Sequence, residues 1–236
     1  MGGIALVGGD EFRPDCEPMD RALLAGIAHQ PPRVVILPTA AARQGPALAA
    51  KNGERWFGRL GARTGSLMVI SPLEASDPKL LAALGDYDAL YLTGGDPALL
   101  LDIAQGSAFA EALRARLRAG ALVVGSSAGA MVLGAAMRYR SPGWTRTLGL
   151  APQVAVLPHH ERAPRADWQE LRESLASLDA DLREVTPLGI PTATACALTD
   201  GDQAWRVVGA RPVTVYAAGG PYQVAPGERF TLGPGS

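Results

Sequence analysis

The chain has 236 residues and a formal net charge of −1, with 47% hydrophobic and 19% charged residues. This balance excludes a disordered protein and gives no sign of a nucleic-acid-binding surface. The 2 cysteines exclude a disulfide-rich scaffold and a cysteine-rich metal site, and we expect no metal or other cofactor. No apolar run is long enough to span a membrane and no signal peptide is recognisable, so we expect a cytoplasmic protein that does not bind membranes.

The first two-thirds of the chain alternates short apolar runs with longer amphipathic segments. Strands are expected at 4–7, 34–37, 67–70, 89–92 and 121–124, with helices at 18–28, 45–60 and 108–118 and a further helix beginning at Asp77-Pro78. Continuous apolar strands separated by helices indicate a parallel sheet that is covered on both faces.

The pattern changes near residue 154. A strand at 154–157 and a helix at 165–178 are followed by short strand-like runs at 193–198, 204–208 and 213–216, and the tail at 217–236 is rich in glycine and proline. We predict a single α/β domain over residues 1–236. It is a three-layer αβα sandwich with a mostly parallel central sheet, an antiparallel C-terminal edge and an irregular tail. In such folds the functional site lies at the carboxyl ends of the strands.

A serine motif follows the expected strand at 121–124. The run Gly125-Ser126-Ser127-Ala128-Gly129 matches G-x-S-x-G, which places a serine on a sharp turn between a strand and a helix. Ser127 is then a candidate nucleophile, and the Ala128 N–H can donate to an oxyanion. The alternative is a glycine-rich turn whose serines only cap the following helix.

A serine nucleophile needs a base, and the chain has 3 histidines to offer, His29, His159 and His160. His29 stands at the end of an expected helix, where it can serve as a cap. His159 and His160 follow the expected strand at 154–157, at the same end as Ser127. Adjacent residues of an extended chain point to opposite sides, so only one of this pair can be the base. A surface pair without a catalytic role is the alternative.

These motifs together resemble the dipeptidase E and cyanophycinase family of serine peptidases. The resemblance rests on Thr93-Gly94-Gly95-Asp96, Gly125-Ser126-Ser127-Ala128-Gly129-Ala130 and Pro158-His159, and extends to 36–41 and 7–12. It implies a fold like that of class I glutamine amidotransferases, with Ser127 as the nucleophile and His159 as the base. It also implies an oxyanion hole formed by Ala128 and a backbone N–H of the Gly94-Gly95 turn.

The third catalytic residue departs from the family pattern, because no aspartate or glutamate occurs from Ala112 to His160. Glu161 is a candidate, since residues i and i+2 of an extended chain share one face and Glu161 could then orient His159. A Ser–His pair without a carboxylate is the alternative. Asp10, Glu11 and Asp96 are among the other acids that loops could bring to this end of the strands.

Arginines surround the serine motif and suggest an anionic substrate. Arg138, Arg140, Arg162 and Arg165 are candidate carboxylate ligands, with Arg165 preferred because the family places a substrate-reading arginine near this position.

The leading hypothesis is a serine peptidase, monomeric or homodimeric, that hydrolyses short peptides through an acyl-enzyme. One alternative is a cyanophycinase-like hydrolase of aspartyl-arginine material. The other is a catalytically weak, amidotransferase-like binding module.

Overall fold

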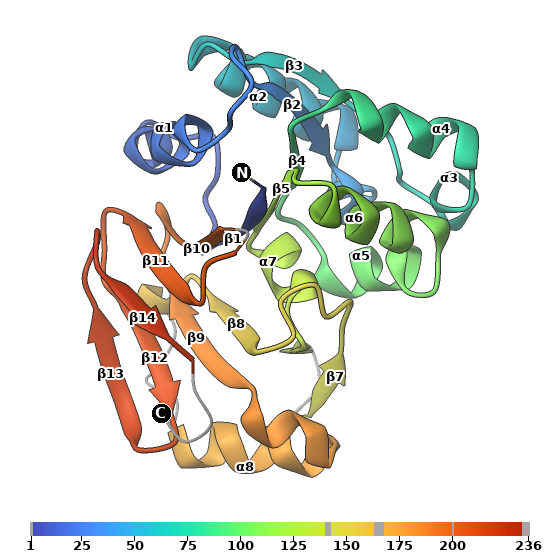
Figure 1. Ribbon diagram of the computed structural model, residues 1–236. Coiled ribbons are helices and arrows are strands. Elements are labelled where there is room, and N and C mark those ends of the chain that lie inside the picture. Colours follow the sequence, from blue (N-terminus) through green and yellow to red (C-terminus); the bar gives the residue numbers. More distant parts are fainter. Residues whose placement is uncertain (1, 140–142, 163–167, 200, 233–236) are drawn as a thin grey trace.

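The computed structural model describes residues 2–139, 143–162, 168–199 and 201–232. Its largest sheet has 8 strands in the order β14-β11-β10-β1-β5-β4-β2-β3. Five neighbouring strands run parallel: β1 (Gly3–Val7), β5 (Leu122–Ser126), β4 (Ala89–Leu92), β2 (Arg33–Leu37) and β3 (Arg63–Ser66). Antiparallel strands continue the sheet beyond β1: β10 (Thr194–Thr199), β11 (Ala204–Gly209) and β14 (Arg229–Thr231). The mostly parallel sheet with an antiparallel edge is therefore confirmed (Figure 1).

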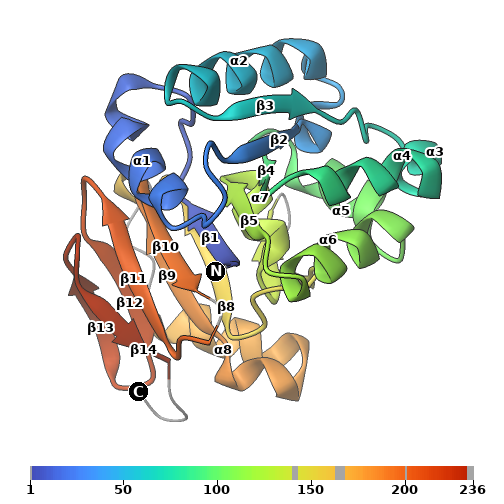
Figure 2. The same ribbon diagram turned by 45° about the horizontal axis from the view of Figure 1, so that its top comes forward.

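Helices cover this sheet on both sides. The α-helices are α1 (Glu17–Ala25), α2 (Pro46–Arg59), α3 (Pro72–Ala75), α4 (Pro78–Ala82), α5 (Pro97–Ala104), α6 (Ala108–Arg118), α7 (Ala128–Leu133) and α8 (Trp168–Leu178). Short 3-10 helices lie at 14–16, 39–41, 83–86, 160–162 and 180–184. Figure 2 shows α1 and α2 on one side of the parallel strands and α5 and α6 on the other.

The two sides of the sheet bury two separate hydrophobic cores. Successive residues of a strand point to opposite faces. Val35 and Leu37 of β2 accordingly pack with residues of α5, α6 and α7, whereas Val34 and Ile36 pack with α1 and α2. A strand that is buried on both faces has to be apolar throughout, which is why these strands appear in the sequence as continuous apolar runs.

A second sheet lies beside the first and carries the segment that leads to the histidines. Its order is β13-β12-β9-β8, with β13 at Gly220–Val224, β12 at Val213–Ala217, β9 at Thr186–Ile190 and β8 at Val154–Pro158. Strand β8 pairs in parallel with β9, and the remaining pairs are antiparallel. A separate pair, β6 (Ala136–Arg138) and β7 (Trp144–Arg146), precedes β8.

The structure corrects two sequence-based expectations. The strand expected at 67–70 lies earlier, at β3 (Arg63–Ser66). The apolar run that suggested a strand is a non-strand segment in which Leu67 and Val69 are buried. The tail at 217–236 is not irregular, because residues 220–224 and 229–231 form β13 and β14, while 233–236 lie outside the described residues. The described glycines and prolines of this region lie in turns or on the edge strand β13, positions that tolerate them: Gly219, Gly220, Pro221, Pro226 and Gly227.

The described helices have at most 14 residues, whereas a membrane span needs roughly 20 apolar residues. None of them, over the ranges given above, is long and apolar enough to cross a membrane.

Candidate active site

Ser127 lies on the turn between β5 and α7. Its backbone has φ 48° and ψ −106°, a region that residues with a side chain rarely adopt. The flanking glycines make the turn possible. A Cβ on Gly125 would lie 2.5 Å from the carbonyl carbon of Gly129, and a Cβ on Gly129 would lie 2.6 Å from the Leu92 oxygen. The motif therefore needs its two glycines for close backbone packing, as the strand–turn–helix context predicts.

His159 reaches Ser127 from the end of β8. Its Nε2 lies 3.0 Å from the Ser127 Oγ, within hydrogen-bond distance. The His159 N–H donates to the Gly8 oxygen at 2.8 Å, and the ring lies against Gly9, where a Cβ would come within 2.3 Å of its Cε1. The loop after β1 thus holds the backbone of His159 and leaves room for its ring.

His160 points elsewhere. Its Nε2 lies 3.2 Å from the Tyr216 hydroxyl, and its ring packs over Gly189. Burial lowers the pKa of His160. Of the two adjacent histidines that the sequence left open, the structure brings only His159 to Ser127. His29 lies in a different place, with its Nδ1 3.2 Å from Asp88.

Glu161 does not meet the His159 ring as the spacing had suggested. Its two carboxylate oxygens accept hydrogen bonds from the Thr192 N–H at 3.1 Å and the Thr192 hydroxyl at 2.8 Å. Burial acts to raise the pKa of Glu161, but the hydrogen bonds from Thr192 and from its own backbone, together with the charge of Arg211, outweigh it and the pKa is lowered. The expectation failed because residues 160–162 form a 3-10 turn instead of an extended chain, so i and i+2 do not share a face.

The carboxylate beside the His159 ring belongs to Asp10. Its Oδ1 lies 3.9 Å from Nδ1 of His159. Asp10 also forms an ion pair with Arg162, and the hydrogen bond from that guanidinium holds the pKa of Asp10 below its usual value. The ion pair therefore favours the charged form of this carboxylate.

Two turns bring backbone N–H groups near Ser127, because Gly94 and Gly95 line the same cavity and Ala128 follows Ser127 in the chain. The Gly94 N–H donates to Oε1 of Glu11 at 2.7 Å and is therefore occupied. The Gly95 and Ala128 N–H groups donate to no protein acceptor within the part of the chain that the structure describes. Gly95 is exposed, and Ala128 is the first residue of α7, where backbone N–H groups have no partner within the helix.

A cavity of about 400 Å³ opens over these groups. It is lined by Ser127 and His159, by Gly94 and Gly95, and by residues of the loop after β1 and of α2: Asp10, Glu11, Phe12, Arg13, Ala49 and Asn52. A neighbouring cavity of about 490 Å³ shares Glu11, Phe12, Arg13 and Asn52 with it and adds Arg55, Trp56 and Arg59. Each has the size of a small-molecule site.

Backbone strain is concentrated around this cavity. Among the described residues, four of the five non-glycine positions with positive φ line it: Asp10, Phe12, Ser127 and His159. Each such residue costs on the order of 1–3 kcal/mol, and such strain is typical of functional sites.

The two described arginines among those proposed from the sequence, Arg138 and Arg162, do not line this cavity. Arg138 pairs with Glu170, and Arg162 is engaged by Asp10 and lies 3.4 Å from Glu161. Arg140 and Arg165 lie outside the described residues. The cations that line the two cavities are instead Arg13, Arg55 and Arg59.

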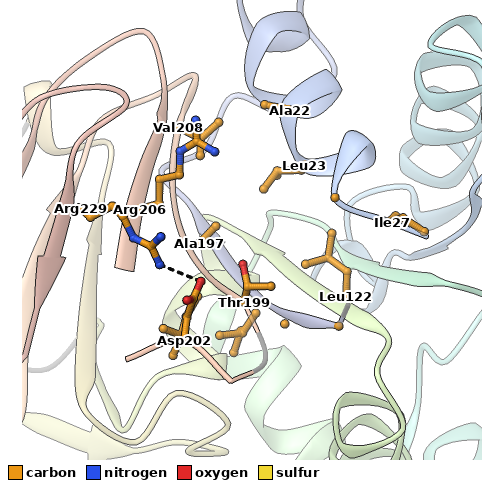
Figure 3. A pocket seen from close by; sticks show the side chains of 15 residues that line it. Ala22, Leu23, Ile27, Leu122, Ala197, Thr199, Asp202, Arg206, Val208 and Arg229 are labelled. Carbon is orange, nitrogen blue, oxygen red and sulfur yellow. Dashed lines mark ion pairs between the residues drawn. The ribbon is translucent and has the colours of Figure 1, made fainter. Parts of the chain in front are cut away.

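A further cavity, of about 180 Å³, lies at the opposite ends of β1 and β5. Figure 3 shows its apolar floor, which includes Leu23, Ile27 and Leu122, and the ion pair of 2.8 Å between Arg229 and Asp202 at its side. Its described lining contains no serine, cysteine or histidine, so it offers no Ser–His or Cys–His pair. The candidate active site is therefore the cavity that holds Ser127.

The sequence matches the Peptidase family S51 model over residues 4–203. The chain belongs to this family. It is a serine-type peptidase of the dipeptidase E and cyanophycinase family, and the family resemblance that the motifs predicted is confirmed. No curated protein gives a significant match to the chain.

Two solved structures share the fold of this S51 peptidase. A peptidase from an acI-B1 Actinobacterium is 25% identical, with a TM-score of 0.83 over 98% of this chain and 97% of its own. A putative peptidase E protein from Listeria monocytogenes EGD-e is 17% identical, with a TM-score of 0.62 over 89% of this chain and 99% of its own. The latter comparison confirms the α/β fold with its large, mostly parallel sheet.

The contribution of the loop after β1 was not expected from the sequence. Asp10 and Glu11 were predicted only as acids that could come near the site, and Arg13, Asn52 and Arg55 were not predicted to line it. A signal was present, because Gly8-Gly9-Asp10-Glu11 follows directly on a buried parallel strand. The carboxyl end of such a strand is where this class of fold places its functional residues.

Proposed function

We propose that this S51 peptidase hydrolyses short peptides through an acyl-enzyme on Ser127, with His159 as the general base. The observation that carries the proposal is the 3.0 Å contact between Ser127 Oγ and His159 Nε2 at a strained strand-to-helix turn. A nucleophile and a base within hydrogen-bond reach are the signature of covalent catalysis.

The reaction follows from the positions of these groups. Ser127 Oγ attacks the peptide carbonyl carbon while its proton passes to Nε2 of His159. The Gly95 and Ala128 N–H groups stabilise the oxyanion that forms. His159 then gives the proton to the leaving amine as the C–N bond breaks. A water molecule, deprotonated by the same ring nitrogen, hydrolyses the ester and restores Ser127.

Asp10 is the carboxylate we propose to orient His159. Its 3.9 Å separation from Nδ1 exceeds a hydrogen bond, but catalytic contacts in unliganded sites are often long and tighten when substrate binds. Asp10 and the backbone of Gly8 approach His159 from the same loop, so one short segment sets both the position and the tautomer of the ring.

The cations beside the site favour peptides with a carboxylate. Arg13 lines both cavities, and Arg55 and Arg59 extend from α2 into the second. Within the described residues Arg55 makes no ion pair or hydrogen bond, so its guanidinium is available to a ligand. Like charges would oppose the arginine side chains of aspartyl-arginine material, and we therefore favour acidic short peptides over a cyanophycinase-like substrate.

The test combines a covalent probe with a peptide screen. A fluorophosphonate should label the wild-type protein and the control Ser177→Ala, whose serine lies on the exposed part of α8, but not Ser127→Ala. A panel of dipeptides and longer peptides should show turnover of short acidic members by the wild type only. Turnover by Ser127→Ala at the wild-type rate would refute the mechanism.

A further inference from the structure

Glu11 connects the two turns that face the reacting carbonyl. Its Oε1 accepts a hydrogen bond from the Gly94 N–H at 2.7 Å, and its Oε2 accepts one from the Ser126 hydroxyl at 2.7 Å. Glu11 follows β1, Gly94 follows β4, and Ser126 ends β5, immediately before Ser127. One carboxylate therefore ties together the ends of three adjacent strands.

The neighbours of Gly94 hold the same turn from its other sides. The Thr93 hydroxyl donates to the Gly94 oxygen at 3.2 Å, and the Asp96 N–H donates to the Ala40 oxygen at 2.8 Å. The C=O and N–H of a trans peptide point in opposite directions. Fixing the Gly94 oxygen toward Thr93, which is buried, therefore directs the Gly95 N–H away from it.

This turn needs external support because it contains two consecutive glycines. Gly95 has φ 143°, and a Cβ there would lie 2.3 Å from the Ala40 oxygen, so no larger residue fits. Glycine is also the residue with the greatest backbone freedom. The two glycines that the turn needs therefore also allow the peptide between Gly94 and Gly95 to rotate unless neighbouring residues hold it.

We propose that Glu11 is a positioning residue of the peptidase reaction. Its carboxylate holds the Gly94-Gly95 turn against Ser126, which keeps the Gly95 N–H aimed at the oxyanion. This inference rests on the proposed acyl-transfer function. Glu11 acts through Gly94 and Ser126 and takes no proton from the substrate, and both of its oxygens already accept hydrogen bonds from the protein.

The variants Glu11→Ala and Glu11→Gln separate this role from a general loss of structure. Misplacing one oxyanion donor costs roughly 10²–10³-fold in kcat, so we expect a loss of that order in Glu11→Ala with little change in KM. Glu11→Gln should recover most of the rate, because its amide oxygen can still accept from Gly94 and its amide nitrogen can donate to Ser126. Glu228→Ala is the matched control, since it removes another carboxylate that accepts a backbone N–H, far from the site.

A second measurement reports on the oxyanion directly. A peptide aldehyde adds to Ser127 and forms a tetrahedral hemiacetal, whose oxygen occupies the position of the oxyanion. Its inhibition constant should weaken in Glu11→Ala by about the factor lost in kcat, and should not change in Glu228→Ala. Titration of active sites with a fluorophosphonate, run to completion, corrects both measurements for the amount of folded enzyme.

Several outcomes would overturn the proposal. These are an unchanged kcat in Glu11→Ala, a Glu11→Gln variant as slow as Glu11→Ala with its titrated sites intact, or a loss explained wholly by fewer titrated sites. If Glu11→Ala does not fold, Ser126→Ala can be used instead, because it removes the hydroxyl that donates to Glu11. This variant should lower kcat by a smaller factor than Glu11→Ala. An unchanged kcat in Ser126→Ala would also refute the role of Glu11. Turnover by Ser127→Ala would instead refute the proposed function itself.

Discussion

Nδ1 of His159 lies 3.9 Å from Oδ1 of Asp10 and is buried without a hydrogen-bond partner among the described residues. A buried polar atom without a partner is costly, and a small movement of either side chain would form the missing bond. Asp10 is held on its other side by Arg162, so the carboxylate approaches the ring as part of an ion pair. The negative charge of Asp10 therefore lies next to Nδ1, the ring nitrogen that does not face Ser127. At this position it would stabilise the imidazolium form of His159.

The first prediction compares Asp10 with Glu161. Asp10→Asn should lower kcat by at least about 100-fold with little effect on KM, because the amide can select the wrong tautomer; the same change in a serine protease costs roughly 10⁴-fold. Glu161→Gln should change kcat by less than about tenfold, since Glu161 is bonded to Thr192 and not to the ring. Steady-state kinetics on one short acidic peptide measures both variants, and the reverse ranking would restore Glu161 as the orienting residue.

The second prediction concerns the two adjacent histidines. His159→Ala should be as inactive as Ser127→Ala, because the two groups act as a unit and their losses do not add in the double variant. His160→Ala should retain most of the turnover per titrated site, although losing the contact with Tyr216 should lower the melting temperature. The kinetics of both single variants and of the Ser127→Ala/His159→Ala double variant tests this pairing. An inactive, fully folded His160→Ala would contradict it.

The sequence predicted the parts of the site that local patterns encode. The strand–turn–helix around Ser127 follows from apolar periodicity and two glycines, and the order Ser127 then His159 follows from motifs. It did not predict which acid meets His159. That contact joins residues 149 positions apart, and it depends on positive φ at Asp10 and His159. The hydrophobic pattern of the sequence gives no indication of these backbone angles.

The placement of β8 illustrates a second limit. Its apolar run predicts a buried strand, and the strand exists, but it pairs with β9 in the second sheet and not in the large one. A run of apolar residues specifies burial and leaves the choice of partner to long-range packing. Glu161 was misplaced for a related reason, because the step from extended strand to 3-10 turn occurs within a few residues and changes the face that each side chain occupies.

The third prediction concerns the carboxylate preference. Arg55→Met should raise KM for a dipeptide with an acidic side chain and a free C-terminus, because it removes a guanidinium without a protein partner among the described residues. Amidating the C-terminus and replacing the acidic side chain, one at a time, identifies which carboxylate the residue reads. Arg118→Met, on the exposed end of α6, is the control and should leave all three KM values unchanged. Equal effects of Arg55→Met on charged and neutral peptides would indicate a packing role.

The last prediction concerns Asp20, a buried residue of α1 whose side chain is bonded to Trp56, which lines the second cavity. Its Oδ2 accepts a hydrogen bond from Nε1 of Trp56 at 2.7 Å, while Oδ1 has no hydrogen-bond partner among the described residues. Burial raises the pKa of Asp20 to about 7. Between about pH 4 and pH 7 the folded chain therefore keeps a proton that the unfolded chain has lost. The free energy of unfolding accordingly falls as the pH rises through this window, and the contribution of Asp20 is constant above it.

Asp20→Asn removes this titration and keeps an oxygen that can accept from Trp56. The variant and the wild type should differ least near pH 4, and the variant should become the more stable of the two as the pH rises to 8. A pKa difference of this size corresponds to roughly 4 kcal/mol at most. Urea unfolding of both proteins at pH 4.5, 6 and 8 measures the effect, and the difference between them cancels the titration of all other groups that the substitution leaves undisturbed. A constant difference across this range would show that the buried carboxyl is ionised throughout and that its environment does not raise the pKa.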